Sequence, residues 1–85
     1  MKLNVYTIKD IKAETFGNPF YSTNDQTAKR SLEQASNDPN TTISQYPEDF
    51  VLYRLGSWDD SNATITTLDT PFYLSTGATK EETNK

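Results

Sequence analysis

The sequence of 85 residues contains neither cysteine nor histidine. Without cysteine the chain has no disulfide framework and no thiolate ligand. Without histidine it lacks both the commonest acid–base catalyst and the commonest transition-metal ligand. Glycine is also scarce, and Gly17, Gly56 and Gly77 are isolated, so a glycine-rich phosphate-binding loop is absent. We therefore expect no catalytic residues, no metal site and no cofactor, and we do not expect an enzyme.

Long apolar runs are missing as well. No segment approaches the ~20 consecutive apolar residues that span a membrane. The N-terminal stretch MKLNVYTIKD has lysines but lacks the continuous apolar run of a signal peptide. The expected location is the cytosol, with no membrane partner.

The formal net charge is −4, and it is distributed unevenly along the chain. Residues 1–37 hold five basic and four acidic side chains, a net +1, whereas residues 38–85 hold three basic and eight acidic, a net −5. An acidic total argues against broad duplex binding, because such binding neutralises many phosphates. It leaves room for a local basic patch in the first half.

The composition predicts one small domain with a thin core. Only 33% of the residues are hydrophobic, but 12% are aromatic, which is too many for a fully disordered chain. A chain of this size buries roughly 60–65% of its unfolded surface. Small domains often gain burial by oligomerising, so we expect a homo-oligomer, most simply a dimer.

Hydrophobic periodicity predicts an α+β fold. The expected elements are a strand at 2–9, an arm or short edge hairpin at 10–21, a helix at 24–36, a central strand at 49–58, a return strand at 63–68 and an extended segment at 69–75. Thr23 with Gln26 fits a capping box at the helix start, and Asp25 sits in its first turn. The order β-α-β-β gives a three-stranded antiparallel sheet with one helix on one face. Residues 1–75 form the domain, and residues 76–85, with nothing to bury, form a disordered tail.

The strands carry apolar side chains on both faces, so the second face of the sheet needs cover. At a period of two, the central strand points Phe50, Leu52, Arg54, Gly56 and Trp58 one way and Val51, Tyr53, Leu55 and Ser57 the other. One helix covers only one face, and aromatic rings are costly to leave in water. The candidates for the cover are the arm at 16–21, the segment at 71–74, a second protomer or stacked nucleobases.

Basic residues alternate with aromatic ones in a pattern typical of a single-strand nucleic-acid surface, where cations follow the backbone and rings stack on bases. The candidate residues are Lys2, Tyr6, Lys9, Lys12, Lys29, Arg30, Tyr53, Arg54 and Trp58. The alternative is a solvated face of ordinary surface lysines with the aromatics in the core, and the residues alone favour it.

Two pairs of neighbouring acids, Glu48-Asp49 and Asp59-Asp60, raise the question of a Mg²⁺ site. Adjacent acids in a strand point to opposite faces, and both pairs flank turns. We interpret them as solvated turn residues and as charges that flank an apolar strand and oppose its aggregation.

Three segments resemble the small nonstructural protein of gokushoviruses, which are microviruses with circular single-stranded DNA genomes. They are M-K-L-N-V-Y-T-I-K-D-I-K at 1–12, D-Q-T-A-K-R at 25–30 and P-E-D-F-V-L-Y-R-L-G-S-W-D-D at 47–60. The resemblance extends over roughly residues 1–68, in the family's order and spacing. It supplies no catalytic residues; the residues in its motifs are Lys2, Tyr6, Lys9, Lys12, Lys29, Arg30, Tyr53, Gly56, Trp58 and Asp59.

The resemblance implies a nonstructural accessory protein in the host cytoplasm that acts in replication or packaging of a single-stranded DNA genome. Binding of single-stranded DNA is the leading expectation, although the acidic total charge departs from it. The alternative is a modulator that docks on the replication initiator, the capsid precursor or a host factor through the uncovered sheet face.

Overall fold

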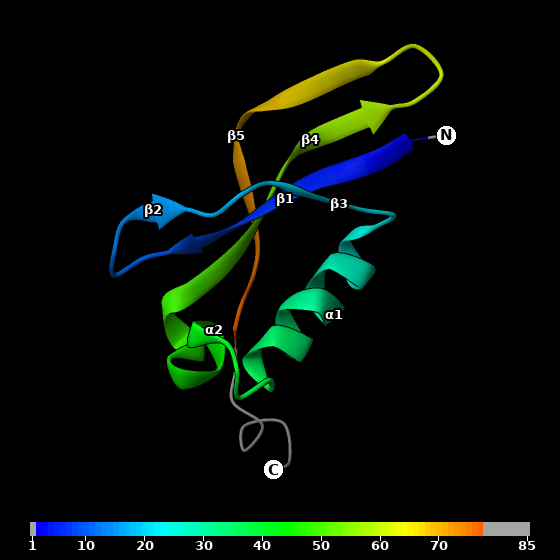
Figure 1. Ribbon diagram of the computed structural model, residues 1–85. Coiled ribbons are helices and arrows are strands. Elements are labelled where there is room, and N and C mark those ends of the chain that lie inside the picture. Colours follow the sequence, from blue (N-terminus) through cyan, green and yellow to red (C-terminus); the bar gives the residue numbers. More distant parts are fainter. Residues whose placement is uncertain (1, 78–85) are drawn as a thin grey trace.

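The computed structural model describes residues 2–77 as a curled antiparallel sheet with one main helix, α1, along one side (Figure 1). The elements are β1 (Lys2–Asp10), β2 (Thr15–Phe16), β3 (Phe20–Ser22), α1 (Asp25–Ser36), α2 (Thr42–Gln45), a 3₁₀ turn (Pro47–Asp49), β4 (Phe50–Asp59) and β5 (Thr64–Thr76). The predicted α+β class and antiparallel sheet are confirmed. The predicted number of three strands is wrong, because five strands form within the described residues.

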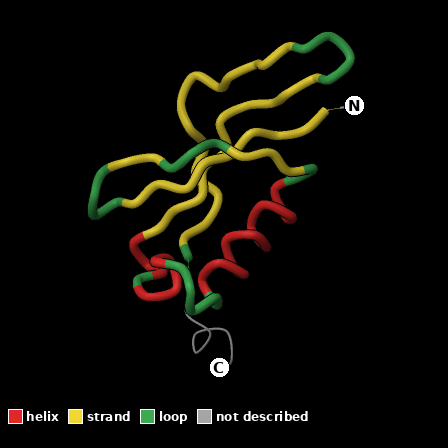
Figure 2. The backbone as a smooth tube through the Cα atoms, in the orientation of Figure 1, coloured by secondary structure: helices red, strands yellow, loops and turns green. Residues whose placement is uncertain are grey.

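β1 and β4 form the centre of the sheet, paired from Lys2 opposite Asp59 to Asp10 opposite Phe50. β5 follows on one edge. β2 and β3 both pair with β1 on the other edge, so they act as one edge strand interrupted at 17–19 (Figure 2). The prediction for 10–21 was an arm or a short edge hairpin; in the structure its two short strands each pair with β1 and not with each other. Pro19 is tolerated there because an edge strand needs fewer ladder donors.

The ladder between β1 and β4 contains a bulge at Leu55. Val5 pairs with Gly56 and Tyr6 pairs with Arg54, so Leu55 is an extra residue on β4. An extra residue shifts every later side chain to the opposite face.

The bulge corrects the predicted facing of Trp58. A strict period of two puts Trp58 with Leu52 and Arg54, on the helix side. In the structure Trp58 pairs with Leu3 while Tyr53 pairs with Thr7, which places Trp58 and Tyr53 on the same face, away from the helix.

β5 joins the predicted return strand and extended segment into one strand. Its ladder with β4 is irregular at the same place: Arg54 pairs with Phe72 and Gly56 with Thr67, so residues 68–71 lie opposite Leu55 alone. β5 bends there, and the outer half of the β4–β5 hairpin extends beyond the helix (Figure 1).

The ordered backbone continues into the first two residues of the predicted tail. β5 includes Thr76, and the buried Gly77 donates its backbone N–H to the Phe50 carbonyl at 2.9 Å. The remainder of the predicted tail, 78–85, lies outside the described residues.

The helix begins as its sequence predicts, with a different cap. Asn24 is the N-cap: its side chain accepts from the Thr27 backbone N–H at 2.8 Å, and its own backbone is extended. The predicted capping box of Thr23 and Gln26 is therefore wrong by one position. Asp25 lies in the first turn, where the helix dipole favours an anion.

The core lies between α1 and one face of the sheet. Tyr6, Ala28, Leu32 and Leu52 form its buried cluster, and Ile8, Phe20, Ile43 and Leu74 pack around it half-buried. The small, fully buried Ala28 lets the helix approach the sheet closely. The opposite face has no helix over it in the described part of the chain.

We predict that Gly56→Ala destabilises the fold by about 1–3 kcal/mol or more. A Cβ atom at this position lies 2.0 Å from the Thr66 carbonyl oxygen and 2.9 Å from the Thr67 Cα, so backbone must move to accept it. Urea denaturation measures the change. Ser57→Ala, one residue further along β4, is the control and should cost less than about 1 kcal/mol. Equal stability of wild type and Gly56→Ala would show that the bulge is not tightly packed.

Candidate nucleic-acid interface

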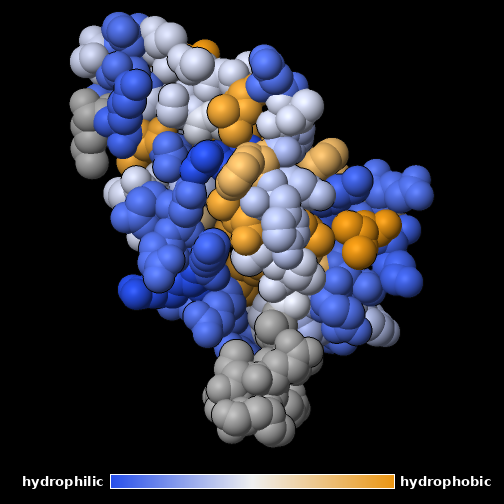
Figure 3. Space-filling model, turned by 180° about the vertical axis from the view of Figure 1, so that it is seen from behind, coloured by the Kyte–Doolittle hydropathy of each residue, from blue (hydrophilic) through white to orange (hydrophobic). Residues whose placement is uncertain are grey.

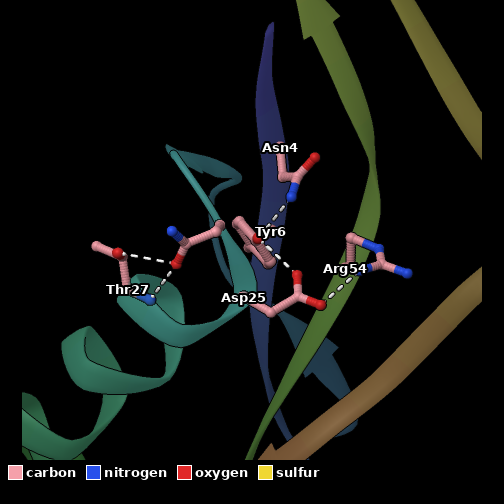
Figure 4. A network of polar contacts seen from close by, with 6 residues as sticks. Asn4, Tyr6, Asp25, Thr27 and Arg54 are labelled. Carbon is pink, nitrogen blue, oxygen red and sulfur yellow. Dashed lines mark hydrogen bonds and ion pairs between the residues drawn. The ribbon is translucent and has the colours of Figure 1, made fainter.

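Two of the predicted interface residues, Tyr6 and Arg54, belong to a polar network under the helix (Figure 4). The Tyr6 hydroxyl donates to Asp25 Oδ1 at 2.7 Å and accepts from Asn4 Nδ2 at 3.0 Å. Arg54 Nη1 donates to Asp25 Oδ2 at 2.6 Å, forming an ion pair. One carboxylate at the start of α1 therefore joins the helix to both central strands.

The network shifts the pKa of both its acidic groups. Burial, together with the hydrogen bond to Asp25, raises the pKa of Tyr6 to about 12. Burial opposes ionisation of Asp25, but the hydrogen bonds from Tyr6 and Arg54 outweigh it, and the pKa of Asp25 is lowered. Asp25 therefore carries its charge at neutral pH, and Tyr6 stays neutral.

Because of these contacts, the side chains of Tyr6 and Arg54 are poorly accessible to a nucleic acid. Tyr6 is fully buried, and its ring stacks on Phe20 with the centroids 5.7 Å apart. Arg54 holds Asp25 and lies 5.0 Å from the centroid of the Phe72 ring. Both side chains serve the packing of α1 on the sheet in this structure.

The opposite side of the sheet carries a row of aromatic rings, which we call the aromatic face: Phe16 on β2, the half-buried Tyr53 on β4 and Tyr73 on β5, with Lys9 on β1. The centroid of Tyr53 lies 5.8 Å from that of Phe16 and 6.3 Å from that of Tyr73, in edge-to-face geometry. Lys9 Nζ lies 5.1 Å above the Phe16 ring. Phe16 is 52% exposed and Tyr73 55%. The row therefore crosses the strands, with the half-buried Tyr53 between two rings that face solvent.

The apolar surface continues along the same side of the sheet. Trp58, half-buried, pairs with Leu3 on one side and with Ile65 on the other, and Tyr21 pairs with Val5. Viewed from behind, apolar side chains gather along the middle of the molecule between hydrophilic flanks (Figure 3).

Of the nine predicted residues, the structure brings three together on this side: Lys9, Tyr53 and Trp58. The other basic residues are dispersed. Lys2 lies opposite Asp59, Lys12 lies in the exposed turn after β1, and Lys29 and Arg30 are exposed on α1. The basic side chains therefore do not form one continuous patch.

Phe16 and Tyr73 were not among the predicted interface residues. Their segments were considered only as cover for the second face, because neither segment showed a strand pattern long enough to assign a facing. The available signal was the run of aromatics beside the Gly17-Asn18-Pro19 turn and in Phe72-Tyr73.

Within residues 2–77, no group of three or more His, Cys, Asp or Glu side chains is placed to hold a metal ion. In the same part of the chain, no helix is both long enough and apolar enough to span a membrane.

The comparison with protein families is decisive for the origin of the chain. The family model described as Phage ORF5 protein matches residues 3–79. The chain belongs to this family. Comparisons with curated proteins and with solved structures found no match. The predicted phage origin of this phage ORF5 protein is confirmed, and the narrower gokushovirus assignment stays a prediction.

We predict that the Tyr6→Phe variant of this phage ORF5 protein loses less stability at alkaline pH than the wild type does. The folded pKa of Tyr6 lies above its ordinary value of 10.0, so the neutral phenol stabilises the fold fully below pH 10. That contribution is lost as the pH rises toward about 12. Over this interval the free energy of unfolding should fall with pH about 1.4 kcal/mol per unit more steeply in wild type than in Tyr6→Phe.

Urea denaturation at stepped alkaline pH measures this difference. Tyr46→Phe alters a tyrosine that is 55% exposed, so it is the matched control and should keep the wild-type slope. If Tyr6→Phe also keeps the wild-type slope, the phenol is not buried against Asp25 as described.

Proposed function

We propose that this phage ORF5 protein is a nonstructural accessory protein that binds single-stranded DNA through its aromatic face. The observation that carries the proposal is the row of Phe16, Tyr53 and Tyr73, whose two outer rings face solvent, with Lys9 beside it. Proteins that bind single strands combine such rings, on which bases stack, with cations that contact the backbone. The protein acts by binding, without catalysis.

The geometry of the row suits a single strand better than a duplex. The rings lie on three different strands, so a bound chain runs across the sheet, and its unpaired bases reach the rings. A duplex keeps its bases stacked inside and offers mainly phosphates, which need many cations. The net charge of −4 and the dispersed lysines disfavour that mode.

Stacking rather than charge is then the main source of affinity. Among the basic residues within 2–77, Lys9 is the one with a ring of the row as its contact, so few phosphates are neutralised and the dependence on salt is shallow but present. Stacking tolerates any base, because every base has a π-face, so we expect weak sequence preference.

The phage family and the resemblance to gokushoviruses support a place in the replication or packaging of a single-stranded genome, in the host cytoplasm. A protein of this kind coats or escorts the single strand as it is made. The alternative function is docking on the replication initiator, the capsid precursor or a host factor. The acidic total charge and the exposed apolar side chains of the same face favour that alternative.

The proposal is tested by titrating the protein with oligothymidine at low salt. Trp58, the only tryptophan, lies on the side of the aromatic face, so its fluorescence should report binding. Phe16→Ala and Tyr73→Ala should each weaken binding by about 1–3 kcal/mol, roughly 5- to 150-fold in Kd. Both side chains are exposed, so neither substitution should alter folding.

Tyr46→Ala is the matched control, because Tyr46 is as exposed as Tyr73 but lies outside the row, at the end of α2. Lys9→Gln should reduce the slope of log Kd against log salt by about 0.7. Absence of any binding, or equal losses in Tyr46→Ala and Tyr73→Ala, would reject the aromatic face as a DNA site and leave the docking alternative.

A further inference from the structure

The outer edge of β5 is an open strand edge. β5 pairs with β4 along one side, and no strand within residues 2–77 pairs with the other side. Such an edge presents unpaired N–H and C=O groups that can pair with another strand. Natural proteins usually shorten, bend or charge their edges to prevent this.

The two edges of this sheet differ in that respect. The edge made by β2 and β3 is protected, because its strands have two and three residues and are separated by a segment that contains Pro19. In β5 the segment Thr64-Ile65-Thr66-Thr67 pairs without a break with 56–59 of β4. It contains no proline and no charge, and every residue in it is exposed, Ile65 by 55%. Its β-branched residues strongly favour strand pairing.

We propose that two copies of this protein pair through this edge, with segment 64–67 of one copy antiparallel to segment 64–67 of the other. The charge pattern of the segment allows a second copy of the chain to pair with it. Although each chain carries a net −4, the paired segments are neutral. When Thr66 meets its counterpart across the two-fold axis, Ile65 lies opposite Thr67 of the second copy, a favourable β-branched pair.

The acids near the segment also avoid one another in this register. Asp60 lies in the hairpin turn and Asp69 in the bend of β5, so no two carboxylates meet within the paired segments. The two-fold axis is perpendicular to the sheet, so the aromatic faces of both copies lie on the same side of one continuous sheet. The inference rests on the edge of β5 and does not depend on DNA binding.

The experiment is sedimentation equilibrium of the full chain at micromolar concentrations, without DNA. The wild type should have twice the 9.6 kDa mass of one chain. The double variant I65K/T67K places like charges opposite each other across the axis, and so does I65E/T67E; each should be a monomer. An equimolar mixture of the two variants should form a heterodimer, because opposite charges then meet.

Circular dichroism of each variant checks that it is folded, and the recovery in the mixture shows that lost pairing is not lost folding. Tyr21→Lys adds a charge to the protected edge and is the matched control, expected to remain dimeric. A monomeric wild type overturns the inference, as does a mixture that stays monomeric or a Tyr21→Lys variant that dissociates. None of these results bears on the oligothymidine titration, which is read separately on the wild-type chain.

Discussion

The extra residue at Leu55 in β4 is the constraint on which the rest of the structure depends. Even-numbered residues before the bulge and odd-numbered residues after it share one face of the sheet. Trp58 therefore lies on the same face as Tyr53 and not on that of Leu52. The extra residue also makes β5 bend, since residues 68–71 must pass opposite a single residue. The ladder resumes at Gly56, where the Thr66 carbonyl approaches so closely that no side chain fits. A bulge of this kind locally raises the twist and bends the strand.

The bulge leaves different kinds of side chain on the two faces of the sheet. Before it, Tyr6 and Arg54 point toward α1 and share the carboxylate of Asp25, so the charged and polar groups of the central strands are used to hold the helix. The ion pair is about one-third exposed, so solvent screens it and its stabilisation is small. The buried ring of Tyr6, at the centre of the apolar cluster, contributes far more through area removed from water. Because one helix covers one face, the rings on the other side stay in solvent.

The sequence predicted the helix, the two central strands and the antiparallel sheet, since their periodic patterns extend over nine or more residues. It left 10–21 open between an arm and an edge hairpin, because the two or three residues of β2 and β3 show no period. The isolated Gly56 inside the strand does indicate a bulge or a close backbone approach, but a count of alternate residues assumes a regular ladder and misses the change of face. That one error moved Trp58 to the wrong face. Of the proposed site, Lys9 and Tyr53 were predicted; Phe16 and Tyr73 were missed because their facing is set by partners distant in sequence.

The apolar area buried in this chain is limited by how few helices and strands cover the sheet, and not by a shortage of apolar side chains. In the described part of the chain six apolar residues are buried, whereas eight large apolar or aromatic residues are exposed. Several of these, including Phe16, Tyr73 and Ile65, lie on the face away from α1 or on the open edge of β5. A domain that leaves so much apolar area in water gains stability from any partner that covers it. Aromatic rings on the sheet face suit the flat surfaces of nucleobases, whereas the neutral, β-branched edge of β5 suits another strand. The two surfaces therefore favour two different partners, and both partners can be bound at the same time.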